Sequence, residues 1–460
     1  MKNIYADKKI ILLHFKIGER DGVSLEIEKR AKILASLGAE VFYVAGSDGL
    51  HHENAYLVEG LNAETSYNQF LREHAFRQRY FEESALAAIY SQIELKVYQQ
   101  LQQAFLAIQP DLLFVHNVFS HGCNLPATTA LVKVLDKYEI PTIAIHHDFW
   151  YEREQLQHPQ YSFIQEIVDV LPPKRSYIVK QQVINSIASE EMLRRRGIQS
   201  DVIGDYFDFH QPIPERDEYN QDLRKTFGIR EQDILILHGT RITPHKVIEN
   251  ALLFASELEH TLRIQAPVRF GSRVFEKDSR VVVLFSNFVE PEAVDYFQAL
   301  KQYQQQLGVQ AVWASERFLP ERRQDNIGGK VYSFWDSYVV ADLVTYTSIQ
   351  EGFGNQLLET VYFKKVPVLL EYPVFEKDLK AEGYRYISLG PSSELISQHG
   401  FRLVAPSFLQ QAVMQTITTL QDVSAVTSVV ENNFQIAKEW HDVAVLEREF
   451  EEFGRWIFSE

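Results

Sequence analysis

The chain has 460 residues, with 46 Lys and Arg against 62 Asp and Glu, and a formal net charge of −16 at pH 7. Such an acidic chain is a poor candidate for enveloping nucleic acid, because phosphate neutralisation needs a clustered Lys and Arg surface. Hydrophobic residues make up 45%, which is typical of a soluble, folded protein, and the length predicts two or three domains. The single cysteine, Cys123, excludes an internal disulfide, and no Cys/His cluster has the spacing of a zinc site.

The N-terminal residues and the apolar runs predict neither export nor membrane insertion. No long apolar core or small-residue cleavage site of a secretion signal begins the sequence. The longest apolar runs, such as 281–285 and 366–370, have the length of strands, whereas about 20 residues are needed to cross a bilayer. We therefore expect a cytoplasmic protein without a transmembrane segment, and nothing in the sequence specifies its oligomeric state.

The first 200 residues alternate short apolar runs with longer segments of helical period. This alternation is typical of an α/β fold with a parallel sheet wrapped by helices. The predicted elements, in chain order, are strand 10–14, helix 24–37, strand 41–45, strand 111–116, helix 127–138, strand 142–146 and strand 176–180. Segment 51–108 is long, polar and aromatic with helical period, so it predicts a helical insertion over the ligand face of the first domain.

A domain boundary is predicted at residues 205 and 206, where an aromatic, Pro-containing stretch breaks the pattern. The pattern then restarts with strand 234–238, helix 247–258, strand 281–285, strand 311–313, strand 343–346 and helix 355–363. We expect two doubly wound domains, 1–205 and 206–432, followed by a C-terminal helix in 433–460 that packs back on the first domain. Because ligands bind beyond the carboxyl ends of parallel strands, the substrate cleft is expected between the two domains.

The most informative motif follows the predicted strand 343–346. Glu351 and Glu359 frame the start of a helix, and Gly352 and Gly354 allow backbone N–H groups to approach an anion. A helix start attracts phosphate through its unpaired donors and its dipole. The natural partners of the two carboxylates are sugar or ribose hydroxyls, so the motif indicates a sugar nucleotide.

A second motif follows the predicted strand 234–238. Gly239 opens a loop that carries Arg241 and Lys246, two cations five residues apart. Such a pair could clamp a diphosphate and stabilise it as a leaving group, although an isolated surface pair is usually only solvated.

Together the two motifs resemble family 4 of the retaining, sugar-nucleotide-dependent glycosyltransferases. The resemblance covers nearly the whole chain and is densest over 334–376. It implies the GT-B architecture, which consists of two Rossmann-like domains with the cleft between them. The first domain would bind the acceptor and the second the donor, which here would be a GDP-, UDP- or ADP-hexose.

The resemblance also assigns roles in the second domain. It implies that Arg241 and Lys246 hold the donor diphosphate, that Glu351 faces the donor sugar and that Glu359 binds the ribose. Backbone amides at the helix start would orient the donor; these belong to Gly352, Phe353, Gly354 and Asn355.

In the first domain, Gly22 is the expected pivot of a loop that reaches the acceptor and the diphosphate. His147 matches the position that contacts a donor-sugar hydroxyl. The candidates on the acceptor side are Arg20, Asp21, Ser24, His116, Asn117 and Asp148.

The resemblance further implies retention without a long-lived enzyme nucleophile. The acceptor hydroxyl would attack the face that the diphosphate leaves, and the diphosphate would help to remove the proton. The expected catalytic residues are then His147, Arg241, Lys246 and Glu351. No metal and no obligatory cofactor is expected, because no Asp-x-Asp cluster follows a strand.

A narrower resemblance is to the subgroup that includes mannosylglucosylglycerate synthases. It rests on the strings 21–26, 116–118, 124–126 and 147–149. Two departures concern the donor loop, where Thr240 separates Gly239 from Arg241 and Val247 replaces the usual glycine. The usual Pro-Asn-Gly between the domains is also replaced, by residues 204–206.

The predicted function is transfer of a hexose from a sugar nucleotide to a hydroxyl of a small, soluble, polar acceptor. That acceptor would be a sugar, a glycerate-type glycoside or a sugar phosphate. One alternative is a disaccharide phosphorylase of the same fold, which would depend on phosphate rather than a nucleotide. Another is a catalytically silent protein that binds a sugar nucleotide.

Overall fold

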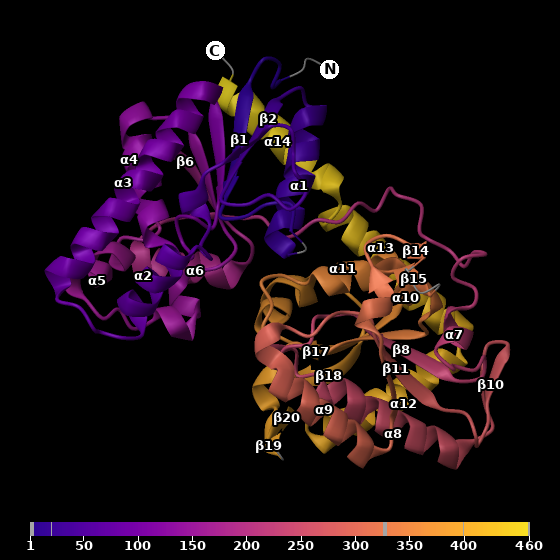
Figure 1. Ribbon diagram of the computed structural model, residues 1–460. Coiled ribbons are helices and arrows are strands. Elements are labelled where there is room, and N and C mark those ends of the chain that lie inside the picture. Colours follow the sequence, from indigo (N-terminus) through magenta and orange to yellow (C-terminus); the bar gives the residue numbers. More distant parts are fainter. Residues whose placement is uncertain (1–3, 20, 325–328, 399, 459–460) are drawn as a thin grey trace. The chain divides into compact units, whose positions relative to one another are not determined.

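The computed structural model describes residues 4–19, 21–324, 329–398 and 400–458. They form two compact units, one of Met1–Asp205 with Ala444–Glu460 and the other of Tyr206–Val443. Each unit contains one large parallel sheet with helices packed around it (Figure 1). The prediction of an α/β protein with two Rossmann-like, doubly wound sheets is therefore confirmed.

The sheet of the first unit has the strand order β3-β2-β1-β4-β5-β6-β7, and all neighbouring strands run parallel. Its strands are β1 (Lys9–His14), β2 (Glu40–Ala45), β3 (Ala55–Leu57), β4 (Leu112–His116), β5 (Thr142–His146), β6 (Ile178–Val183) and β7 (Asp201–Val202). Its helices are α1 (Gly22–Ser36), α2 (Ser66–Phe76), α3 (Glu83–Ile108), α4 (Leu125–Tyr138), α5 (Ser162–Asp169) and α6 (Ser186–Arg196). The strand order reverses between β1 and β4, where doubly wound sheets open a ligand crevice.

Segment 51–108 is not the insertion that its composition suggested. β3 extends the edge of the sheet beside β2. The long helix α3 lies alongside α4 (Figure 1) and buries Val97, Leu101 and Phe105 in the core of the unit. α3 therefore belongs to the crossover that returns the chain to β4, since parallel strands need such a covering connection. The polar residues of this segment mislead because only one side of α3 is buried.

The sheet of the second unit has the order β12-β11-β8-β16-β17-β18, again with parallel neighbours. Its strands are β8 (Ile234–His238), β11 (Val281–Phe285), β12 (Gln310–Trp313), β16 (Leu343–Tyr346), β17 (Val366–Glu371) and β18 (Ile387–Pro391). The helices around it are α7 (Leu223–Thr226), α8 (Glu249–Gln265), α9 (Val294–Leu307), α10 (Phe334–Val340), α11 (Asn355–Tyr362), α12 (Pro406–Gln421) and α13 (Val423–Trp440). Here the strand order reverses between β8 and β16.

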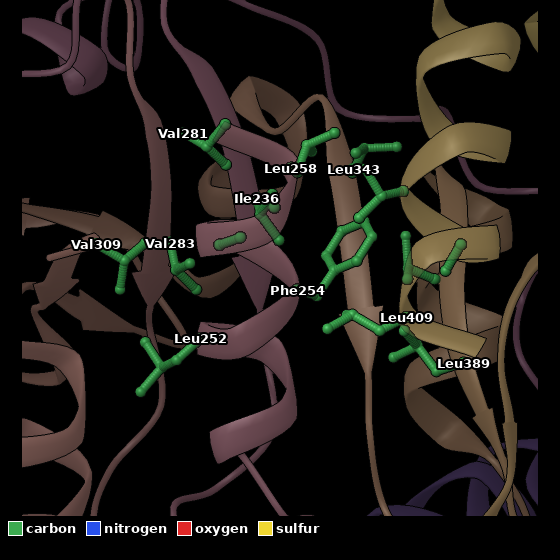
Figure 2. Packing of buried hydrophobic residues seen from close by; sticks show 14 of the residues in the cluster. Ile236, Leu252, Phe254, Leu258, Val281, Val283, Val309, Leu343, Leu389 and Leu409 are labelled. Carbon is green, nitrogen blue, oxygen red and sulfur yellow. The ribbon is translucent and has the colours of Figure 1, made fainter. Parts of the chain in front are cut away.

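Among its described residues, the second unit also has three small sheets. They pair β9 (Val268–Phe270) with β10 (Arg273–Phe275), β15 (Lys330–Ser333) with β13 (Phe318–Leu319) and β14 (Arg323–Gln324), and β19 (Ile396–Gln398) with β20 (Phe401–Leu403). The main core packs α8 and α12 against the large sheet. Figure 2 shows Leu252 and Leu258 of α8 with Val283 of β11, Leu343 of β16 and Leu409 of α12. Burying each such side chain stabilises the fold by roughly 1.5–3 kcal/mol.

The C-terminal residues form two helices rather than one. Residues 433–440, which were assigned to the terminal helix, belong to α13 of the second unit. α14 (Val443–Phe458) follows, and from Ala444 onward it belongs to the first unit. It buries Leu446, Phe450 and Phe453 there, and the Tyr5 hydroxyl donates to the Phe450 carbonyl at 2.7 Å. Among the described residues, no helix has both the length and the apolarity needed to cross a membrane.

Candidate active site

Lys246 and Glu351 meet at the reversal point between β8 and β16. Lys246 ends the short turn after β8, and Glu351 lies in the loop after β16. The Lys246 Nζ is 2.5 Å from the Glu351 Oε1, and only 9% and 15% of the two side chains are exposed. Burial opposes ionisation of Glu351, but the Lys246 ammonium and hydrogen bonds from Ser348 and Tyr346 together outweigh it and hold the pKa of the carboxyl below its usual value. The two sequence motifs therefore form one buried ion pair.

Backbone contacts fix the two loops to each other. The Thr347 hydroxyl donates to the Lys246 carbonyl at 2.8 Å, and the Ile349 N–H donates to the His245 carbonyl at 3.0 Å. Val247 adopts φ 36° and ψ 53°, a left-handed conformation that suits glycine and strains a β-branched residue. The position at which the resembled family has glycine is therefore left-handed in this chain.

α11 begins directly after Gly354, and Glu359 lies one turn into it. The Tyr338 hydroxyl donates to the Glu359 Oε2 at 2.6 Å. The Tyr372 hydroxyl donates to the Phe353 carbonyl at 2.7 Å, and a Cβ on Gly354 would lie 2.5 Å from that hydroxyl. Glycine is therefore required at this position by close packing.

The other residues of the two motifs are less enclosed. Gly352 and Asn355 are exposed at the start of α11. The Arg241 guanidinium contacts the Glu290 carboxylate, and 43% of its side chain is exposed. The structure therefore joins Lys246 to Glu351 but directs Arg241 to a different carboxylate.

A cavity of about 220 Å³ lies beside the same loop of the second unit. Its lining combines aromatic rings with a few polar groups and comprises Ile242, Phe285, Asn287, Val289, Phe297, Lys301, Trp313, Ala314, Ser315 and Glu316. The rings of Phe285 and Trp313 stack with centroids 3.8 Å apart. The Asn287 Nδ2 donates to the Gly239 carbonyl at 3.0 Å, which ties the cavity wall to the loop that carries Arg241.

In the first unit, His116 and His147 stack at the carboxyl ends of β4 and β5. Their ring centroids are 5.4 Å apart, and the His116 Nδ1 is 3.1 Å from the His147 Nε2. His14, which ends β1, places its Nδ1 2.8 Å from the His116 carbonyl. Burial, together with the positive charge of Arg30, lowers the pKa of His147 to about 3. His147 is therefore neutral at physiological pH and can hydrogen-bond as a neutral imidazole.

Asn117 holds the residues that follow β5. Its backbone is left-handed, with φ 59°. Its Oδ1 accepts from the N–H groups of His147 and Asp148, at 2.7 and 3.1 Å, and its Nδ2 donates to the Asp148 Oδ2 at 3.3 Å. Asp148 also pairs with Arg153 at 3.2 Å. The structure thus brings His116, Asn117, His147 and Asp148 together.

The loop after β1 is organised around helix capping. The Asp21 carboxylate accepts from the N–H groups of Val23 and Ser24, both at 3.1 Å, and Lys16 approaches it to 3.2 Å. The Ser24 hydroxyl also donates to Asp21, at 3.1 Å. Gly22 is the first residue of α1, and its role as the pivot of the loop stays a prediction. The left-handed glycine of this loop is Gly18, with φ 65°, and Arg20 lies outside the described residues.

Comparison with known proteins places the chain among enzymes. No protein-family model matches it. It is 34% identical over 444 residues to the mannosylglucosylglycerate synthase of Thermotoga maritima, with 95% of this chain and 98% of that one covered. The enzyme of the same name from Petrotoga mobilis is 31% identical over 394 residues, with 84% and 87% covered.

The chain belongs to the mannosylglucosylglycerate synthase family. It is therefore a glycosyltransferase, as the sequence motifs predicted. Among solved structures, the HepE protein of Anabaena in complex with UDP and glucose is similar, with a TM-score of 0.57 and 14% identity. That match covers 97% of this chain and 99% of HepE, so this family member has the predicted GT-B fold.

Two residues near the candidate site of this mannosylglucosylglycerate synthase family member were not predicted from the sequence. Tyr338, on α10, contacts Glu359, but in the sequence it looks like one more core aromatic. His238 ends β8 and is fully buried, with its ring nitrogens 3.1 Å from the Thr345 hydroxyl and 2.8 Å from the Thr240 hydroxyl. Its position one residue before Gly239 was the available signal.

Across residues 4–19, 21–324, 329–398 and 400–458, no three His, Cys, Asp or Glu side chains are arranged to hold a metal ion. The charged side chains named above lie in both units. In the second unit they are Lys246, Arg241, Glu351 and Glu359. In the first unit they are Asp148 and Arg153 beside neutral His147.

Proposed function

We propose that this chain transfers a mannosyl unit from a nucleotide sugar to a glucosylglycerate-type acceptor, with retention of configuration and without a metal. The names of its relatives supply the product class. The observation that carries the proposal is the buried pair of Lys246 and Glu351 at the start of the loop that leads into α11. The pair supports the proposal because it holds a cation and a carboxylate, which could bind phosphate and sugar hydroxyls, at the reversal point of a doubly wound sheet.

Lys246 and Arg241 would hold the donor diphosphate. An ammonium has three N–H donors, so Lys246 can keep one on Glu351 and offer the others to phosphate oxygens. Arg241, now paired with Glu290, is exposed enough to exchange that carboxylate for the diphosphate. The backbone amides of 352–355 would add the donors and the dipole of a helix start.

The two glutamates would hold the sugar parts of the donor. Glu351 would accept hydrogen bonds from hydroxyls of the transferred hexose, and Glu359 from hydroxyls of the ribose. The nucleobase would enter the cavity next to the Gly239 loop, where aromatic rings offer stacking surfaces and Asn287, Ser315 and Glu316 offer polar groups. GDP-, UDP- and ADP-hexoses all remain candidates for the donor.

In the reaction, the bond between the anomeric carbon and the diphosphate oxygen breaks. The acceptor oxygen forms its bond on the same face, and its proton passes to the departing diphosphate. The negative charge that builds on this leaving group is stabilised by Lys246 and Arg241. Loss of one such preorganised charge costs roughly 2–4 kcal/mol of barrier.

In the first unit, we propose that neutral His147 contacts a hydroxyl of the transferred sugar. Asp148, His116 and Asn117 would serve the acceptor side, together with Asp21 and Ser24 of the α1 cap and with Arg20. A small soluble acceptor in the cytoplasm fits the acidic composition and the single cysteine. No role for nucleic acid is proposed.

The experiment is a thermal-shift screen against UDP, GDP, ADP and their hexose conjugates, followed by product analysis with glucosylglycerate. A ligand at 100 times its dissociation constant stabilises by about 2.7 kcal/mol, so one base should stand out. Lys246→Ala should lower turnover about 30- to 1,000-fold. Lys225→Ala, an exposed lysine on α7, is the control and should not affect turnover.

Two results would contradict the proposal. The first is a phosphate-dependent reaction with sugar phosphates and no nucleotide shift, which would indicate a phosphorylase. The second is nucleotide binding without any glycosyl product from a panel of sugar, glycerate-glycoside and sugar-phosphate acceptors. Analysis of the anomeric configuration of the product by NMR tests retention separately.

A further inference from the structure

Tyr338 carries a buried hydroxyl group that directly contacts one of the proposed donor-binding carboxylates. It lies on α10 and is 0% exposed. Its hydroxyl donates to the Glu359 Oε2 at 2.6 Å. A hydrogen bond to an ionised carboxylate is shorter and roughly twice as strong as one between neutral groups. The contact therefore joins α10 to α11 through the side chain that is proposed to bind the ribose.

The ring of Tyr338 packs against two other aromatic rings, which restrict the direction of its hydroxyl. It stacks on Phe363 with centroids 4.9 Å apart and planes at 18°, and it meets the edge of Phe334 at 5.6 Å. Burial also raises the pKa of Tyr338 well above its ordinary value, so the hydroxyl keeps its proton and remains a donor.

The same hydroxyl lies against the donor loop. A Cβ built on Gly239 would be 2.9 Å from the Tyr338 hydroxyl and 3.2 Å from the Gln356 Nε2. A side chain at Gly239 would therefore displace the group that orients Glu359. Gly239 does not have a left-handed backbone, so this close contact, rather than its φ angle, explains why the loop begins with glycine.

We propose that Tyr338 is a positioning residue that fixes the Glu359 carboxylate for recognition of the donor ribose. The inference rests on the proposed function, in which Glu359 binds ribose hydroxyls. A free glutamate side chain loses rotamer freedom when it binds a ligand, and Tyr338 removes part of that freedom beforehand. Its contribution should therefore appear in donor affinity and in discrimination between ribose and deoxyribose.

The test compares Tyr338→Phe with the wild-type chain. The probes are UDP, GDP and ADP, with the 2′-deoxy and 3′-deoxy forms of whichever nucleotide binds. Tyr338→Phe should raise the KM for the nucleotide sugar about 10- to 100-fold, the range for loss of a hydrogen bond to a charged group, while kcat changes less than about threefold. The affinity ratio between the ribose and deoxyribose forms should fall by about the same factor as the affinity itself.

The matched control is Tyr332→Phe. Tyr332 is also 0% exposed, and its hydroxyl contacts Thr226 and Asp222, away from the donor motifs. This variant should leave the ribose-to-deoxyribose ratio unchanged. Equal effects of both variants on that ratio would show that Tyr338 acts only through stability and would overturn the inference.

Glu359→Gln separates the inference from the proposed function. If Glu359→Gln leaves the ribose-to-deoxyribose ratio unchanged, the ribose role of Glu359 is wrong. If Glu359→Gln lowers the ratio but Tyr338→Phe does not, the positioning role of Tyr338 is wrong. In the double variant, the effect of Tyr338→Phe should shrink to less than about threefold, because the carboxylate that it orients is gone. Should Tyr338→Phe lower the melting temperature, this non-additivity in ligand affinity still reports the contact, and full additivity would contradict it.

Discussion

The ion pair of Lys246 and Glu351 should be essential to the stability of the second unit. The stability that it contributes should depend on pH. The perturbation is Lys246→Met, which keeps the aliphatic stem and removes the charge. With only 15% of its side chain exposed, Glu351 would be left as an uncompensated, largely buried carboxylate. Breaking a buried pair in this manner costs about 3–5 kcal/mol.

The magnitude follows from the geometry. The two atoms are 2.5 Å apart and largely withdrawn from water. At an effective dielectric constant of about 20, unit charges about 4 Å apart attract by about 4 kcal/mol, and this attraction offsets the desolvation of both groups. In the variant the desolvation of Glu351 is no longer offset by the ammonium and should raise the pKa of its carboxyl above the ordinary value.

The sign of the pH dependence reverses between the two proteins. In the wild type the pKa of folded Glu351 is lowered, so its contribution to stability is present above the unfolded pKa and is lost as pH falls. In Lys246→Met the raised pKa makes the folded state bind more protons than the unfolded state, so stability falls as pH rises. The loss caused by the substitution should therefore be larger at pH 8 than at pH 5, by about 1.4 kcal/mol for each unit by which the pKa of Glu351 in the variant exceeds 5.

The assay is urea unfolding of both proteins at pH 8 and pH 5, followed by tryptophan fluorescence. Lys96→Met is the control, because Lys96 and Glu59 are 2.6 Å apart but half exposed. That surface pair should contribute less than about 1 kcal/mol at either pH. A loss in Lys246→Met that is as small as the control, or that is equal at the two pH values, would refute the account of the buried pair.

Three further predictions concern the surroundings of the site. Val247 is left-handed, so Val247→Gly should be about 1 kcal/mol more stable than Val247→Ala in urea unfolding. Both variants lose the buried side chain, but only alanine strains the backbone. Equal stability of the two variants would contradict this prediction. Asn117→Asp should raise the KM for the acceptor about tenfold in steady-state assays and leave donor affinity unchanged. The new carboxylate would lie against the Asp148 charge, and the hydrogen bond that the Asn117 Nδ2 donates to Asp148 would be lost. Unchanged kinetics would show that Asn117 does not serve the acceptor side. Buried, neutral His238, with its pKa lowered to about 3, should cost about 2 kcal/mol of stability on acidification from pH 7 to 5, and His238→Gln should show a correspondingly shallower loss between these pH values.

The central strands were the best-predicted part of the fold. The strands predicted at 142–146, 234–238, 281–285 and 343–346 have the same bounds as β5, β8, β11 and β16. These strands are buried on both faces, so each is a continuous apolar run that ends where polar residues begin. Because the strand ends were placed correctly, the motifs that follow them were also assigned to the correct edge of each sheet.

Partners that come from distant parts of the sequence could not be predicted. Glu351 could be expected near Lys246 only through the family resemblance, since the register of β8 and β16 sets their distance. Arg241 was expected beside Lys246, but its pairing with Glu290 depends on how the loop after β11 folds back. α3 was mistaken for an insertion because a half-buried crossover helix and a solvated insertion share the same polar composition.

The two units share one feature, a buried histidine at the end of a central strand. In each sheet a buried histidine ends the first strand and contacts the strand across the reversal point: His14 reaches the His116 carbonyl of β4, and His238 reaches Thr345 of β16. Burial lowers the pKa of both imidazoles, so they are neutral at physiological pH. A protonated histidine at either place would add positive charge at the reversal point of its own sheet. With both neutral, binding of the anionic donor would depend on the cations Lys246 and Arg241, as proposed above.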